Sequence, residues 1–279
     1  MRKSMIGLSA IALFAAATPA FADAPADDGL GLAITGGASV VSDYRFRGIS
    51  QSNKDFAIQG SVTVTHTSGA YVGFWGSSNQ GQGEIDVIGG FSHQLIPGLT
   101  GDIGVTYYLY PNRRGDGTPG AGFTNGLRGS NELVEPYVDL STTVGPVTGK
   151  VGFAWAPKQD YFASVTPGEL GKRSDNTYLW GDASVGIPNT PLKLTGHVGW
   201  TSNHYLRGVY TDGITSRADV IDFGVGASAS YKALTFGVNF VTTDLPSRFT
   251  TFDYNGNLVG ARSYLGADNT VVFSVGASF

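Results

Sequence analysis

The chain has 279 residues, of which 14% are charged and 41 are Gly, and its formal net charge at pH 7 is −4. A typical soluble domain is roughly 25% charged and roughly 7% Gly. A chain with so little charge and so much Gly favours a fold made of β-strands. The absence of Cys excludes disulfide scaffolds, Cys-ligated zinc and iron–sulfur clusters. The acidic balance argues against a general nucleic-acid binder, and an apolar content of 41% is too low for a helical membrane protein.

Residues 1–22 have the features of a secretory signal peptide. Two basic residues precede an apolar run over 5–17, and an A-x-A cleavage motif ends at Ala22. We therefore expect an exported protein with one domain, residues 23–279. That domain has no apolar run near the ~18 residues that a membrane-spanning helix needs.

Apolar and polar residues alternate over long segments of this domain. In the segment 99–109, Ile103 and Val105 fall on one face, and Asp102 and Thr106 fall on the other. Period 2 sustained over about 9–11 residues is typical of a tilted membrane-spanning strand, whereas strands of soluble proteins more often run about 5–6 residues. Twelve segments have this pattern: 33–44, 56–66, 70–76, 84–95, 99–109, 132–143, 147–156, 176–187, 192–201, 219–230, 234–242 and 269–279.

The connections between these segments alternate in length. Five are tight turns, at residues 67–69, 96–98, 144–146, 188–191 and 231–233. Six are long, at residues 45–55, 77–83, 110–131, 157–175, 202–218 and 243–268. This asymmetry is typical of an outer-membrane barrel with short periplasmic turns and long outer loops, and an even strand number places both ends of the barrel on the periplasmic side.

Aromatic residues agree with this orientation. The four Trp residues fall at strand ends beside long connections, where we expect an outer aromatic girdle: Trp75, Trp155, Trp180 and Trp200. One face of the last segment ends in an aromatic residue and resembles the signal that the barrel assembly machinery reads: Val271, Phe273, Val275, Ala277 and Phe279. Pro136 lies inside a predicted strand, and because a closed barrel has no edge strand, we expect a β-bulge there.

Charged residues within the predicted strands lie on the polar face. Seven of them are Asp86, Asp102, Asp139, Lys150, Asp182, Lys193 and Asp222. A lipid-facing Lys or Arg costs roughly 2–4 kcal/mol at mid-membrane, so we expect all seven in the lumen. Five carboxylates in an open lumen would favour cations, whereas a plugged lumen would neutralise them in pairs.

Several motifs in the first half resemble the TorF family of porin-like proteins. They are VSDYRFRGISQS (41–52), Gln59-Gly60, YVGFWGSS (71–78), Glu84-Ile85-Asp86 and YYLYP (107–111), and the segment NELVEPY (131–137) is similar to the acidic-aromatic strand of that family. The resemblance implies an outer-membrane, porin-like β-barrel, and it supplies no catalytic residues and no substrate.

Three charged residues mark the start of the first long connection. Asp43, Arg45 and Arg47 alternate onto the polar face where the first strand ends. They could form a charged mouth or constriction that biases which ions pass, or a salt-bridge cluster that seats the loop on the barrel rim. The outer loops hold most other Arg residues, which could attract anionic solutes or lipopolysaccharide phosphates, or simply be solvated.

The four His residues form no metal-binding or nucleophile motif. A lipid hydrolase at the outer rim would need a His there, and only His204 qualifies, so we expect no enzymatic activity and no cofactor or metal.

The sequence thus predicts an all-β, antiparallel transmembrane barrel of about twelve strands. The leading hypothesis is a narrow channel for small hydrophilic solutes or ions, which an inward-folded third or sixth loop could close. A plugged structural or surface-recognition barrel, the rim hydrolase and a soluble exported β-protein are alternatives. The expected partners are outer-membrane lipid and lipopolysaccharide, the barrel assembly machinery and a small solute. Nucleic acid is not among them, and whether the barrel is a homo-oligomer stays open.

Overall fold

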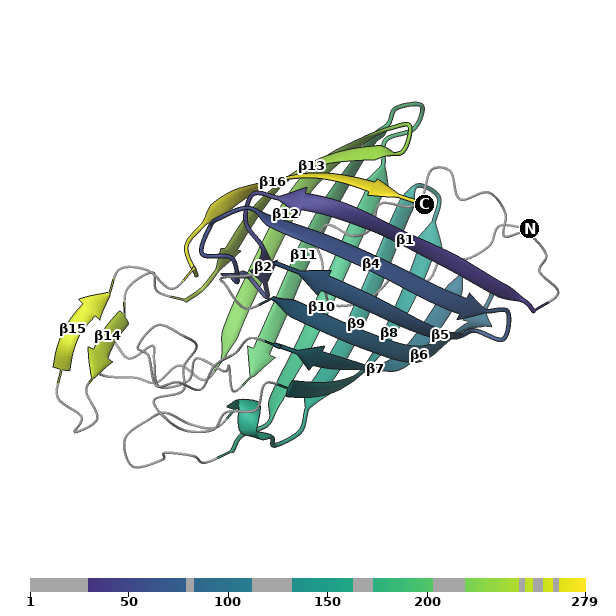
Figure 1. Ribbon diagram of the computed structural model, residues 1–279. Helices are drawn as coiled ribbons and strands as arrows, with labels where there is room; N and C mark the ends of the chain where they lie inside the picture. Colours follow the sequence, from purple (N-terminus) through teal and green to yellow (C-terminus); the bar gives the residue numbers. More distant parts are fainter. Residues whose placement is uncertain are drawn as a thin grey trace.

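A closed antiparallel barrel forms the body of the protein (Figure 1). The computed structural model describes residues 30–78, 83–111, 132–162, 173–202, 219–245, 249–252, 258–262 and 266–279. The predicted signal peptide lies outside these ranges. Twelve strands form the barrel, each paired with the barrel strands next to it in the chain, and β1 closes the ring by pairing with both β4 and β16. The predicted fold class and strand number are therefore confirmed.

The barrel strands are β1 (Leu32–Val41), β4 (Ala57–His66), β5 (Ala70–Ser77), β6 (Glu84–Ile96), β7 (Leu99–Leu109), β8 (Glu132–Val144), β9 (Val147–Ala156), β10 (Asn176–Gly186), β11 (Leu192–Ser202), β12 (Val220–Tyr231), β13 (Leu234–Thr243) and β16 (Thr270–Ser278). Two short hairpins lie in the connections: β2 (Arg45–Phe46) with β3 (Ile49–Ser50), and β14 (Phe249–Phe252) with β15 (Leu258–Arg262). A 3-10 turn spans Asp160–Phe162. Within the described residues, no helix is long and apolar enough to cross a membrane.

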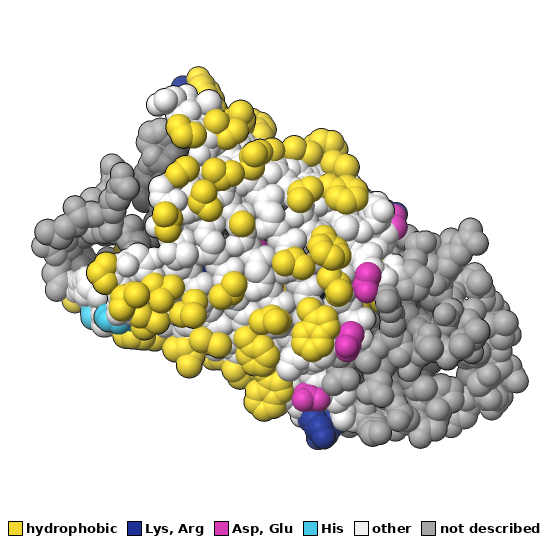
Figure 2. Space-filling model, turned by 180° about the vertical axis from the view of Figure 1, so that it is seen from behind, with side chains coloured by type: hydrophobic (Ala, Val, Ile, Leu, Met, Phe, Trp, Pro, Cys, Tyr) yellow, Lys and Arg dark blue, Asp and Glu magenta, His cyan; other side chains and the backbone are white. Residues whose placement is uncertain are grey.

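The side chains alternate between the outer wall and the lumen. On β9, Val151 and Phe153 are exposed on the outside, whereas Ala154 between Phe153 and Trp155 is fully buried. Figure 2 shows apolar side chains spread over the outer wall, with acidic side chains gathered towards one end of that face. An apolar exterior is what the hydrocarbon core of a bilayer requires, because it cannot solvate polar groups.

Tight turns and long connections lie at opposite ends of the barrel, and the turn end also holds the start of β1 and the end of β16 (Figure 1). The five predicted turns are confirmed within a residue or two. The first uses Gly69 at a φ of +100°, where a Cβ atom would come within 2.2 Å of the Ser92 carbonyl oxygen. Only glycine fits such a turn, because the backbone conformation and the close approach both exclude a side chain.

The β-bulge that we expected at Pro136 is absent. The described β7–β8 ladder runs without a register shift, and Pro136 pairs with Val105. On its other side, the β8–β9 ladder begins only at Tyr137. Two residues before the proline, the Val134 amide donates to the side chain of Gln159 instead of to a strand. Pro136 therefore occupies the position where the missing amide hydrogen removes no ladder hydrogen bond.

Two of the four Trp residues differ from the predicted girdle. Trp155 and Trp200 are exposed on the outer wall, as expected. Trp75 and Trp180 are only 5% and 4% exposed and point into the lumen. Side chains fill the interior of small barrels, and here buried Tyr rings lie beside these two Trp residues, so a strand-end Trp fits on either face.

Among the described residues, the first long connection folds into the lumen, a course that the sequence did not predict. Its residue Tyr44 packs against Trp75 of β5, with ring centroids 5.4 Å apart. At the tip of the β2–β3 hairpin, a Cβ on Gly48 would lie 2.3 Å from Thr243 Cγ2 of β13. The loop therefore reaches across the barrel from one wall to another. Residues 112–131 of the third connection lie outside the described part of the chain.

Candidate functional site

Ionisable side chains from six neighbouring strands form a continuous band on the inner wall. We call this band the charged belt; it consists of Asp102, Asp139, Lys150, Asp182, His197 and Asp222. Asp102 of β7 lies opposite Asp139 of β8. The Lys150 ammonium of β9 lies 3.2 Å from Asp139 and opposite Asp182 of β10. Strand register thus places each charge next to the following one.

His197 continues the belt across β11. Its Nδ1 lies 2.6 Å from Asp182 Oδ1, and its Nε2 lies 2.9 Å from Asp222 Oδ1. The Tyr178 hydroxyl lies 2.9 Å from the same Nε2 and 3.3 Å from Asp222. An ionised carboxylate only accepts hydrogen bonds. The His197 ring lies between two such acceptors, so it links Asp182 of β10 to Asp222 of β12.

Tyrosine hydroxyls complete the other end of the belt. Tyr71 of β5 donates to Asp102 Oδ1 at 2.7 Å and also bonds the Tyr137 hydroxyl of β8. Asp102 is 5% exposed, and a buried carboxylate needs such donors to offset its loss of hydration. The carboxylates of the belt outnumber its cations, so the lumen wall is acidic.

Asp43 and Arg45 form a buried ion pair at the base of the first loop. Arg45 Nε donates to Asp43 Oδ2 at 2.6 Å, and both side chains are almost fully buried. Arg45 Nη1 also donates to the backbone carbonyls of Gly266 and Asp268 in the last long connection. The pair therefore fastens the first loop to the last one.

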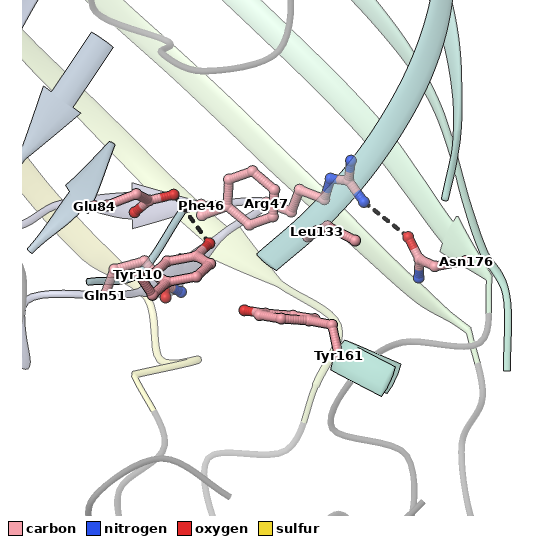
Figure 3. A pocket seen from close by; sticks show the side chains of 8 residues that line it. All are labelled: Phe46, Arg47, Gln51, Glu84, Tyr110, Leu133, Tyr161 and Asn176. Atoms are coloured by element: carbon pink, nitrogen blue, oxygen red, sulfur yellow. Dashed lines mark hydrogen bonds between the residues drawn. The ribbon is translucent and has the colours of Figure 1, made fainter. Parts of the chain in front are cut away.

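Arg47 does not join that pair. β1 ends at Val41, so the expected alternation from Asp43 to Arg47 on one strand face is wrong. Arg47 Nη2 instead lies 2.7 and 2.8 Å from the two carboxylate oxygens of Glu135 on β8. Its Nη1 donates to Asn176 Oδ1 on β10 at 2.9 Å, as Figure 3 shows. Its guanidinium carbon lies 4.1 Å from the centroid of the Tyr178 ring.

The backbone at Arg47 is in an unusual conformation. Arg47 and Gly48 are the two central residues of the β2–β3 turn, with φ of 46° and 80°. Both angles are positive, as in the type I′ turns of two-residue hairpins, but for a non-glycine residue this conformation costs about 1–2 kcal/mol. Burial alone would lower the pKa of Arg47, but the Glu135 carboxylate raises that pKa above its ordinary value. The ion pair thus holds a strained residue in place.

Carboxylates gather beside Arg47. Glu84 accepts a hydrogen bond from the Tyr110 hydroxyl at 3.0 Å. Asp86, two residues along β6, has no exposed surface, and neither of its carboxylate oxygens has a hydrogen-bond partner among the described residues. Burial, reinforced by Glu84, raises the pKa of the Tyr44 hydroxyl. A cavity of about 20 Å³, little more than one water in size, lies here and is lined by Phe46, Arg47, Gln51, Glu84, Tyr110, Leu133, Tyr161 and Asn176 (Figure 3).

The ten candidate residues from the sequence therefore fall into separate groups. Asp102, Asp139, Lys150, Asp182 and Asp222 meet in the belt, and Lys193 lies on the same face of β11 as His197, nearer the tight turns. Asp86 lies near Tyr44 of the first loop. Sequence reasoning missed Glu84, Glu135, Asn176 and Tyr178. Asn176 and Tyr178 could have been found from their even spacing with Asp182 on one strand, because that spacing places all three on the lumen face.

A protein site for a metal ion is a group of side chains that can bind the ion together. In the described part of the chain, no group of three or more His, Asp or Glu side chains could hold a metal ion. His204, the only candidate for a rim hydrolase, lies outside the described residues.

The fold and the lumen define a porin-type barrel, with an apolar exterior and a charged interior. The chain belongs to the family described as "Bacterial protein of unknown function (Gcw_chp)", whose model matches residues 25–279. No curated protein matches the chain.

Solved porin structures share this fold. The NanC porin is 12% identical, with a TM-score of 0.54 over 88% of this chain and 99% of that chain. The KdgM porin is 7% identical, with a TM-score of 0.50 over 88% and 98% of the two chains. At such identities the likeness concerns the fold alone.

Proposed function

We propose that the protein is an outer-membrane channel through which small hydrophilic solutes or ions diffuse passively. The observation that carries the proposal is the closed twelve-stranded barrel with an apolar outer wall and a belt of ionisable side chains inside. Such a wall belongs in lipid, and such an interior is suited to polar cargo rather than to chemistry. The resemblance to the TorF family and the porin fold support the same function.

The features of the chain's ends agree with this location. A signal peptide over residues 1–22 would export the chain, and residues 23–279 would form the barrel domain in the outer membrane of a Gram-negative bacterium. The barrel assembly machinery would read the last strand, and lipid and lipopolysaccharide would surround the product. Arg residues of the long connections would contact lipopolysaccharide phosphates.

The lumen should prefer cations. The belt has four carboxylates but only Lys150 and His197 as cationic partners. At physiological salt, fixed charges act over about 8–10 Å, which is comparable with the radius of a narrow pore. Cations are therefore enriched in the lumen and anions are depleted.

A plugged barrel that acts through its outer loops is the second candidate. The first loop crosses the lumen, and Arg47 pairs with Glu135 on the wall. This is the neutralisation in pairs that a plugged lumen requires.

Conductance across planar bilayers separates the two candidates. The purified, folded protein should give discrete current steps, with a reversal potential of the sign expected for cations in a salt gradient. Heat-denatured protein from the same preparation is the control. Folded barrels that never conduct would exclude the channel and favour the plugged barrel.

A further inference from the structure

The wall residues that surround Arg47 are held in position by partners other than Arg47. Glu135 Oε2 accepts a hydrogen bond from the Tyr108 hydroxyl at 2.9 Å. Asn176 Nδ2 donates to the Ser202 carbonyl at 2.7 Å, which directs its Oδ1 towards Arg47. Both acceptors would therefore keep their orientation if the arginine left.

The Tyr178 ring is fixed in the same way. It stacks on Trp180, with centroids 5.5 Å apart and an angle of 15° between the planes. Its hydroxyl bonds His197 in the charged belt. We call Glu135, Asn176 and Tyr178 the guanidinium seat. All three belong to barrel strands, so the seat is a property of the wall.

The present occupant of the seat comes from a loop that is not part of the barrel. Arg47 lies at the tip of a hairpin with two residues in each strand, and its φ is in the left-handed region. Arg45 fastens the base of this loop through Asp43 and the last long connection, and its Nη1 also donates to the Gly48 carbonyl at the tip, at 3.0 Å. For the tip to leave the seat, the contacts of Arg47 and the Arg45–Gly48 hydrogen bond must break, while the ion pair of Arg45 with Asp43 keeps the base attached.

An empty seat would leave a buried carboxylate without its cation. Glu135 is 2% exposed, and its carboxylate is the ion-pair partner of Arg47. Removing one partner of a buried ion pair is strongly unfavourable. Arg47 is therefore released most readily in exchange for another cation.

We infer that the guanidinium seat is a binding site for a guanidinium-bearing solute, which displaces Arg47 and so opens the first loop; this rests on the proposed channel function. A planar guanidinium can stack on Tyr178 while different nitrogens reach Glu135 and Asn176, as Arg47 does. A compact ammonium cannot make these contacts together.

The wild-type protein provides the first test. Guanidinium chloride at up to about 50 mM, compared with methylammonium chloride at equal ionic strength, is added to single channels in bilayers. We expect a higher conductance level when the first loop is open. Guanidinium should increase the fraction of time that the channel spends at this level at least 2-fold, and methylammonium should have no such effect. Equal effects of the two cations would overturn the inference.

Variants test the site itself. Arg47→Ala empties the seat without competition, so it should bind guanidinium at least 10-fold more tightly than the wild type. Adding Glu135→Gln to that variant should remove the gain. Lys54→Ala is the matched control, because it removes one positive charge from the same loop at a half-exposed pair with Asp268. It should behave as the wild type does.

Binding is read from the thermal midpoint of the detergent-solubilised barrel, which needs no conductance. Guanidinium should raise the midpoint of Arg47→Ala, but not that of the double variant. Two results would overturn the inference. In one, Arg47→Ala binds guanidinium no more tightly than the wild type; in the other, Glu135→Gln does not remove the tighter binding. If Glu135-dependent binding appears in barrels that never conduct, the site stands and the channel proposal fails. If Arg47→Ala does not fold, the wild-type comparison decides.

Discussion

Arg45 is the residue whose loss should release the first loop. Its ion pair with Asp43 is buried on both sides, with side chains 1% and 4% exposed. Breaking a buried pair by removing one partner costs about 3–5 kcal/mol, because the remaining charge is left uncompensated. We expect Arg45→Gln to lower the local stability of residues 42–56 by this order, measured as faster hydrogen exchange of their amides, while the barrel strands stay protected.

Lys54→Ala is the control for that prediction. Lys54 also pairs with the last long connection, through Asp268, but its side chain is 39% exposed. Exposed pairs contribute about 0–1 kcal/mol, so the exchange of the loop should hardly change. If Arg45→Gln exchanged no faster than Lys54→Ala, the Asp43–Arg45 pair would not be what holds the loop.

At the scale of the strands, alternation and turn chemistry sufficed to predict the barrel. A strand with lipid on one side and a polar lumen on the other must alternate, so the sequence carries the pattern on every strand. Alternation could also have predicted the inward position of Trp180, because residues 180 and 182 lie on the same face of the strand and Asp182 was expected in the lumen. Proximity to a long connection predicts the face of a Trp less well than alternation does, because aromatic rings fit both in a narrow lumen and in an outer girdle.

Contacts between loop and wall could not be predicted in this way. Arg47 and Glu135 lie 88 residues apart in the chain, and local periodicity contains nothing about which distant charges meet. The inward course of the first loop depends on the shape of the closed barrel. Sequence spacing therefore suggested one cluster of Asp43, Arg45 and Arg47, where the structure has two separate ion pairs.

The arrangement of the connections predicts which segments face the outside of the cell. Epitope tags inserted at Gly117 or Gly168, in long connections outside the described residues, should be labelled on intact cells. Tags at Gly98 or Asn189, in tight turns, should be labelled only after the outer membrane is permeabilised. Antibody labelling of both groups before and after permeabilisation measures this, and equal labelling on intact cells would refute the orientation.

For the molecule as a whole, closure depends on the seam between β1 and β16. The Phe279 amide donates to the Gly36 carbonyl at 2.9 Å, and the Gly36 amide donates back at 3.0 Å. Deleting Phe279 removes both hydrogen bonds and the terminal aromatic of the expected assembly signal. We expect less folded, heat-modifiable protein on gels, with unchanged export to the periplasm. An unchanged folded yield would show that neither the seam nor the signal needs this residue.

The selectivity of the whole channel should follow from its acidic lumen. Asp102→Asn removes one belt charge and keeps an oxygen that accepts from Tyr71, so the wall should retain its structure. The reversal potential in a gradient around 0.1 M salt should move towards that of a less cation-selective pore. The shift should shrink near 1 M salt, where the screening length is about 3 Å. Asp160→Asn removes an equal charge from an exposed pair with Arg173 in a loop and should leave the potential unchanged. Identical potentials for Asp102→Asn and the wild type, in channels that still open, would contradict a role of the belt in selectivity.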